Sequence, residues 1–109
     1  MLYIGIDISK YKHDCTVIDD AGVIVRNVFS FNNDRAGFNQ FLDMYHSLDP
    51  TEIKKIGFEA TGHYQDNFKV FLEQSGLSFV EFLCRNRSKR LYKEVLSLLW
   101  NQSRHSMRK

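Results

Sequence analysis

The chain contains Ile4-Gly5-Ile6-Asp7 near its start and Ile56-Gly57-Phe58-Glu59 near its middle. Both segments place a glycine between two apolar residues and end on an acid, and both have the short apolar character of a buried strand. Because side chains alternate along a strand, each acid shares a face with the glycine two residues before it. If the two strands are parallel neighbours, about 4.8 Å apart, Asp7 and Glu59 lie side by side at the carboxyl edge of the sheet. Ligands of α/β proteins bind at that edge.

Two carboxylates placed side by side repel each other, so one of them must take up a proton or a cation must lie between them. The hard oxygen ligands of Asp7 and Glu59 suit Mg²⁺ or Mn²⁺. A pair of such ions can activate water and stabilise the leaving oxygen in phosphodiester cleavage. Asp7 and Glu59 are therefore the candidate catalytic residues and metal ligands. The alternative is that they are strand-end acids, one capping the following helix and the other exposed.

Outward from these two segments, the hydrophobic pattern predicts further strands and two helices. Strands are predicted over residues 2–8, 12–18, 22–30, 53–58 and 77–83. Asn32-Asn33-Asp34 offers caps for a first helix that ends near residues 49–50. Residues Tyr64, Phe68, Phe71 and Leu72 mark a second helix, which Gly76 closes. This order predicts an α/β domain with a mixed sheet of about five strands, the first three antiparallel, flanked by helices.

Composition indicates one globular domain with an uneven charge distribution. The 109 residues contain no apolar run long enough to cross a bilayer, and no basic signal segment precedes Asp7, so a cytoplasmic protein without a membrane partner is expected. Cys15 and Cys84 are expected to be free thiols. Residues 1–83 hold 7 basic and 12 acidic residues, whereas residues 84–109 hold 8 basic and 1 acidic residue. The second segment is therefore predicted to be a basic tail, with a basic amphipathic helix over residues 88–100.

Several basic and polar residues are candidates for binding nucleic acid. Lys10 follows the first acid closely, and Thr61 and His63 follow the second in a strand-to-helix turn, where they can contact phosphate. The basic tail adds Arg85, Arg87, Lys89, Arg90 and Lys93. The alternative for each is an ordinary solvated or turn residue. His13, His46 and His105 have no metal-ligand spacing and are expected at the surface or at an edge.

Three motifs together resemble the N-terminal domain of DEDD-type transposases of bacterial insertion sequences, which are related to the Piv and MooV invertases. They are Gly5-Ile6-Asp7-Ile8-Ser9-Lys10, Asn33-Asp34-Arg35-Ala36-Gly37-Phe38 and Glu59-Ala60-Thr61-Gly62-His63-Tyr64. The resemblance covers residues 1 to about 83. It implies a ribonuclease H-like fold similar to RuvC Holliday-junction resolvases, with an Asp, Glu, Asp, Asp tetrad that holds divalent metal. Asp7 and Glu59 match the first two members of this tetrad.

The chain departs from the family pattern after residue 83. The resemblance implies two further aspartates downstream, but the last aspartate of this chain is Asp66. The sequence of residues 84–109 does not follow the family, which is the expectation for a truncated or frame-shifted gene. Complete relatives are implied to be DNA recombinases, some with a structured guide RNA, so DNA, such an RNA and further copies of the chain are candidate partners. This fragment is expected to bind Mg²⁺ or Mn²⁺ weakly and to cleave no DNA alone.

Two other classes of function compete with this interpretation. A non-catalytic module would hold nucleic acid through the basic tail, with Tyr92 and Trp100 available for stacking. A nucleotide-binding fragment of the actin and sugar-kinase type would also open with an apolar-Gly-apolar-Asp strand. Proteins of that type usually follow the acid with a Gly/Thr-rich phosphate loop, whereas residues 9–12 contain no glycine.

Overall fold

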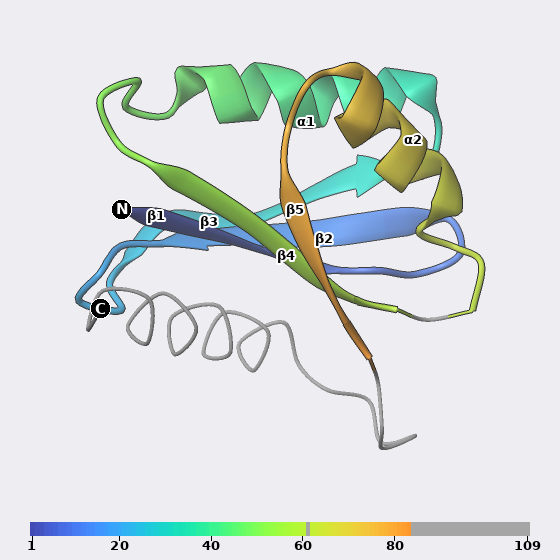
Figure 1. The fold of residues 1–109 in the computed structure, drawn as a ribbon, viewed down its shortest axis with the longest axis horizontal. Coiled ribbons are helices and arrows are strands. Elements are labelled where there is room, and N and C mark those ends of the chain that lie inside the picture. The colour runs from blue at the N-terminus through green and yellow to red at the C-terminus, as the bar shows by residue number, and fades with distance from the viewer. Residues whose placement is uncertain (61, 84–109) are drawn as a thin grey trace.

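The computed structural model describes residues 1–60 and 62–83, which form a mixed five-stranded sheet with two helices on one face (Figure 1). The elements are β1 (Leu2–Asp7), β2 (Lys12–Ile18), β3 (Ile24–Asn32), α1 (Arg35–Ser47), β4 (Lys54–Ala60), α2 (Asp66–Gln74) and β5 (Phe79–Leu83). The strand order is β3-β2-β1-β4-β5. The first three strands pair antiparallel, and β4 and β5 are added in parallel. The predicted α/β sheet is confirmed.

The turn between β2 and β3 is longer than the predicted one, so β3 begins at residue 24 rather than 22. The Asp19 carboxylate accepts hydrogen bonds from the backbone N–H groups of Ala21 and Val23. Gly22 closes the turn at a φ of +79°, a left-handed conformation that favours glycine. Because Val23 still donates to Asp19, it belongs to the turn, and ladder pairing with β2 starts one residue later.

Two residues of the motif Asn33-Asp34-Arg35-Ala36-Gly37-Phe38 determine how α1 starts. The Asp34 side chain caps the helix by accepting a hydrogen bond of 2.8 Å from the Gly37 N–H. Gly37 itself lies against the backbone of Asn32, where an added Cβ would come within 2.0 Å of the Asn32 carbonyl oxygen. A side chain at position 37 would therefore push the helix away from the end of β3.

Helix α2 ends as predicted but begins later. Gly76 adopts a φ of +73°, and Leu77 donates its backbone N–H to the Leu72 carbonyl at 2.9 Å, which is the bond of a Schellman ending. The predicted helix marker Tyr64 lies ahead of the first helical residue and is 44% exposed. Thr61, in the turn before this helix, lies outside the described residues, and the observed N-cap, Gln65, makes no side-chain capping bond.

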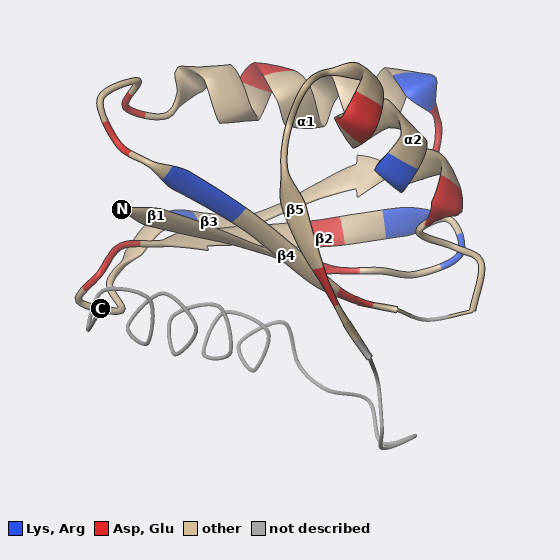
Figure 2. Ribbon diagram, viewed as in Figure 1, with Lys and Arg blue, Asp and Glu red and all other residues tan. Residues whose placement is uncertain are grey.

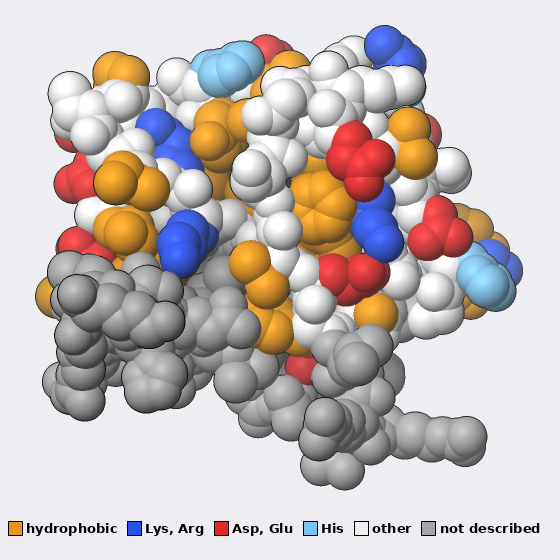
Figure 3. Space-filling model, viewed as in Figure 1, with side chains coloured by type: hydrophobic (Ala, Val, Ile, Leu, Met, Phe, Trp, Pro, Cys, Tyr) orange, Lys and Arg blue, Asp and Glu red, His pale blue; other side chains and the backbone are white. Residues whose placement is uncertain are grey.

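A polar contact ties α2 to the edge strand β5. Lys69 of α2 contacts the Glu81 carboxylate at 2.9 Å, and the buried Gln65 side chain donates to the same carboxylate at 3.2 Å. The Glu81 hydrogen bond is the main reason that the pKa of Lys69 lies above its ordinary value. In Figure 3 a basic side chain is visible among acidic ones over α2 and β5.

The main core lies between the sheet and the two helices, and Phe68 of α2 is at its centre. Phe68 is fully buried. The centre of its ring lies within 6.1 Å of the centres of five other rings, which come from α1 and from β2, β3 and β4: His13, Phe31, Phe38, Phe41 and Phe58. One side chain therefore joins the antiparallel half of the sheet, the parallel half and both helices.

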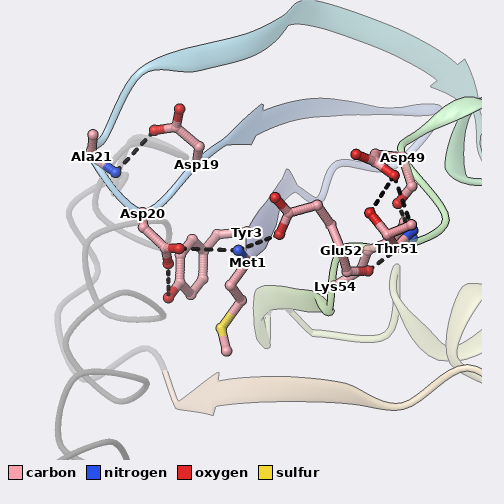
Figure 4. Close-up of polar contacts among 9 residues, drawn as sticks. All are labelled: Met1, Tyr3, Asp19, Asp20, Ala21, Asp49, Thr51, Glu52 and Lys54. Atoms are coloured by element: carbon pink, nitrogen blue, oxygen red, sulfur yellow. Dashed lines mark hydrogen bonds and ion pairs between the residues drawn. The ribbon is translucent and has the colours of Figure 1, made fainter.

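The opposite face of the sheet carries a smaller apolar cluster around Tyr3. The Tyr3 hydroxyl donates to Asp20 at 3.1 Å, and the Met1 ammonium contacts Asp20 at 3.0 Å and Glu52 at 2.5 Å (Figure 4). The two carboxylates raise the pKa of the Met1 ammonium, and the ammonium lowers the pKa of Asp20. These bonds join the β2–β3 turn and the segment before β4 to the start of β1.

His13 and Cys15 of β2 both point into the main core. His13 is fully buried and accepts a hydrogen bond of 3.2 Å from the Ser9 N–H, so its expected place at the surface or an edge is wrong. The sequence did not show that the helices cover this part of β2. Cys15 is a free, buried thiol, and burial raises its pKa to about 12. Cys84 lies outside the described residues, as does the whole predicted tail, residues 84–109 with its helix.

No helix in the part of the chain that the structure describes is long and apolar enough to cross a membrane.

Replacing Phe68 by alanine is expected to lower the free energy of unfolding by about 3–5 kcal/mol, because it removes the ring that the other core rings contact. Val70 on the same helix is 51% exposed, so Val70→Ala should cost less than about 0.5 kcal/mol. Urea denaturation of both variants checks this. Similar losses for the two variants would show that Phe68 is not at the centre of the core.

Burial of His13 should make stability depend on pH. Desolvation holds the pKa of His13 below its ordinary value of 6.5, and the nearby Asn33 side chain only partly opposes this. As the pH decreases, His13 is therefore protonated at a higher pH in the unfolded chain than in the folded one. The stability that neutral His13 contributes is complete above pH 6.5 and falls as the pH decreases through the lower, folded pKa. Denaturation midpoints between pH 7.5 and 5.5 should fall in the wild type and change less in His13→Gln, and equal slopes would contradict this.

Candidate functional site

The two repeated segments lie side by side in the sheet. Strands β1 and β4 are parallel neighbours, and their register pairs Ile4 with Ile56, Gly5 with Gly57 and Ile6 with Phe58. The segments are therefore aligned residue for residue. Asp7 and Glu59 are the next residues on the two strands, so they lie at the carboxyl end of the aligned segments.

Asp7 and Glu59 share one face of the sheet but differ in burial. By the alternation of the strands, both point to the face opposite the two helices, which is the face that carries Tyr3. Asp7 is exposed, whereas Glu59 is only 7% exposed and has Phe82 of β5 as its neighbour on the other side. In Figure 2 acidic segments at the ends of β1 and β4 lie at the same side of the sheet. The Asp7 side chain therefore faces solvent, whereas the Glu59 side chain is buried.

A third acid lies in the same row across the sheet. Asp14 of β2 pairs directly with Asp7 and is half-buried, and its carboxylate accepts a hydrogen bond from the Ser30 hydroxyl. Sequence reasoning missed Asp14, because its place opposite Asp7 depends on the register between β1 and β2. Residues 1–60 and 62–83 nevertheless contain no group of three or more His, Cys, Asp or Glu side chains that could hold a metal. The described acids form a neighbouring pair and no larger ligand set.

The candidate phosphate contacts Lys10 and His63 lie on the two loops that leave β1 and β4. Lys10 is exposed, and its ammonium lies 5.2 Å from the centre of the Tyr11 ring. The His63 side chain is 94% exposed and lies 3.8 Å from the Asp66 carboxylate. Both residues are therefore accessible at the same sheet edge as the acids. The other candidates are outside the described residues: Thr61, Arg85, Arg87, Lys89, Arg90 and Lys93.

Asn33, between β3 and α1, links these two loops. Its side-chain amide donates to the Lys10 carbonyl at 3.1 Å and to the Tyr64 carbonyl at 3.2 Å, and its backbone N–H donates to the Tyr11 carbonyl at 2.8 Å. The loop that follows Asp7 and the loop that follows Glu59 are therefore held by the same side chain. Sequence reasoning named Asn33 as a candidate helix cap and as the start of one family-like motif, and no local signal in the sequence shows the longer-range contacts.

The chain is similar to a family of transposases and to solved structures of two other proteins. Residues 4–94 match a family model described as a transposase, of the DEDD type. RuvC of T. thermophilus in complex with a Holliday junction substrate has a similar structure, with a TM-score of 0.54 and 13% sequence identity, over 91% of this chain and 76% of that one. A Ppx/GppA family member of Aquifex aeolicus is similar at a TM-score of 0.44 and 16% identity, over 76% of this chain and 35% of that one. A search of curated proteins gave no match.

Proposed function

This chain belongs to the DEDD family of transposases, and we propose that Asp7 and Glu59 are the metal-binding acids of its RuvC-like, nuclease-type domain. The observation that supports this role is the register of β1 and β4, which aligns the two repeated segments and brings their acids to one face at one edge. The two strand-end acids are thereby neighbours, although 46 residues lie between the end of β1 and the start of β4 in the sequence.

The donor set fits a hard divalent cation. Carboxylate oxygens are preferred ligands of Mg²⁺, which is commonly bound by one or two carboxylates while it keeps several waters and takes phosphate oxygens of the substrate. Asp7 and Glu59 supply such a pair. When bound, the ion would polarise a phosphodiester and lower the pKa of a water molecule.

The different burial of the two acids suits different tasks. Glu59 is set back beneath the surface, where the lower effective dielectric strengthens its attraction for a cation. Asp7 is exposed and leaves one side of the pair accessible to a strand of DNA. Lys10 and His63, on the loops beyond the acids, are proposed to contact the phosphates that flank the reacting one. We propose the same role for the remaining candidates: Thr61, Arg85, Arg87, Lys89, Arg90 and Lys93.

DNA is the proposed substrate. The matched family consists of transposases, and the RuvC structure with the similar fold is bound to a Holliday junction. We also propose that residues 1–83 are the RuvC-like domain and that residues 84–109 add a basic segment that attracts the phosphate backbone. A guide RNA and a homo-oligomer stay predictions from the sequence.

Neutralising either acid should weaken Mn²⁺ binding. We expect the full chain to bind Mn²⁺ weakly and Asp7→Asn or Glu59→Gln to reduce the affinity about tenfold or more, because each removes half of the charged donor set. Electron paramagnetic resonance of free Mn²⁺ measures this directly. Asp43→Asn, which removes an exposed acid of α1, is the matched control and should bind Mn²⁺ as the wild type does. Unchanged Mn²⁺ affinity in both site variants would refute the assignment.

The 109-residue chain alone is expected not to nick DNA. It contains two of the four acids that the family resemblance implies, and its last aspartate is Asp66. Incubating the chain and Mg²⁺ with supercoiled plasmid and with a four-way junction, and resolving the products on gels, tests this. Mg²⁺-dependent nicking that disappears in Asp7→Ala would show that two acids suffice.

A further inference from the structure

We propose that Tyr11 and Tyr64, on the two loops that leave the acid pair, form one surface on which unpaired bases of a DNA strand stack. Tyr11 is 75% exposed and Tyr64 is 44% exposed, although aromatic side chains of this size are usually buried to a large extent. Their two loops start from Asp7 and from the segment after Glu59. The inference rests on the proposed function, because it assumes that a DNA strand reaches these acids.

The two tyrosines belong to one surface because Asn33 holds their loops together. A single side-chain nitrogen donates to the carbonyl of Lys10, beside Tyr11, and to the carbonyl of Tyr64 itself. The backbone N–H of Asn33 binds the Tyr11 carbonyl as well. The loops are therefore fixed to the body of the protein at the start of α1, and the positions from which both rings project are set before any ligand binds. Such preorganisation lowers the entropic cost of binding.

Charge beside the rings favours nucleic acid over an apolar partner. The Lys10 ammonium lies over the Tyr11 ring, 5.2 Å from its centre, and the exposed His63 is next to Tyr64 in the chain. Surfaces that bind single strands combine aromatic rings, which accept any base, with basic groups that contact the backbone. An apolar protein interface would instead exclude charged groups from its centre.

The rings select for unpaired bases. In a duplex the faces of the bases are covered by their neighbours, so a tyrosine ring has no free base face to stack on unless a base is displaced. Single strands and the open centre of a branched junction present such faces. The surface therefore contributes to binding of single-stranded or branched DNA and little to binding of a linear duplex.

The test is fluorescence anisotropy of the full chain with a labelled 20-nucleotide single strand and with the matching duplex. Tyr11→Ala and Tyr64→Ala should each lower single-strand affinity by about five- to one-hundredfold, and duplex affinity by less than about twofold. Tyr11→Phe and Tyr64→Phe keep the ring and should restore single-strand binding. Ile53→Ala, at an apolar residue that is 66% exposed just before β4, is the control and should change neither affinity.

Salt dependence separates stacking from charge. The slope of log affinity against log salt should be unchanged in the two alanine variants and shallower in Lys10→Ala by about 0.7, the value for one phosphate contact on a single strand. The stacking surface is refuted if the alanine variants bind the single strand as the wild type does, if they lose duplex affinity equally, or if the phenylalanine variants bind as weakly as the alanine variants. It is also refuted if the wild type binds no single strand.

These outcomes differ from a failure of the proposed function. That function is refuted if Mn²⁺ affinity is unchanged in the Asp7 and Glu59 variants. Neither tyrosine is altered in that measurement. If Mn²⁺ affinity depends on both acids but single-strand affinity is unchanged in Tyr11→Ala and Tyr64→Ala, only the stacking surface is refuted. Both alanine variants replace exposed side chains and keep the backbone carbonyls that Asn33 binds, so their thermal midpoints should match that of the wild type.

Discussion

The parallel pairing of β1 with β4 is the constraint on which the rest of the structure depends. It joins an antiparallel three-stranded half of the sheet to a parallel half, and its register aligns Gly5 with Gly57 and Ile6 with Phe58. A shift of one residue would turn Glu59 toward the helices and Phe58 away from them, because side chains alternate. Burial of Ile6 and Phe58 in the main core therefore holds the two acids on the opposite face.

The aromatic core stabilises this register from one side only. Both helices pack on the same face, where Phe68 contacts rings from β2, β3, β4 and α1 (Figure 1). Within the described residues, the other face carries the small cluster around Tyr3 and the row of acids. The two faces therefore differ in role: apolar packing fixes the strands on one face, while the carboxylates stay on the face that α1 and α2 leave uncovered.

Asn33 couples the core to the loops beyond the acids. It lies at the end of β3, where the Asp34 cap and the close approach of Gly37 to Asn32 set the start of α1. From there its side chain reaches both loops. Loops held in this way keep their exposed side chains in one arrangement. The family-like motif that begins with Asn33 therefore has a structural role, because it holds the two loops beside the candidate site.

The sequence by itself determined the order of strands and helices and the repeated apolar-Gly-apolar-acid segment that makes Asp7 and Glu59 candidates, because alternation, helical periodicity and turn chemistry are local. It misjudged the start of β3, where hydrogen bonds at the Asp19 turn decide the boundary, and it placed Tyr64 in α2, which begins at Asp66. Only the tertiary structure decided that Asp14 faces Asp7, that His13 is buried and that Asn33 joins two loops. Each of these depends on strand register or helix packing between segments distant in the chain, which no local pattern encodes.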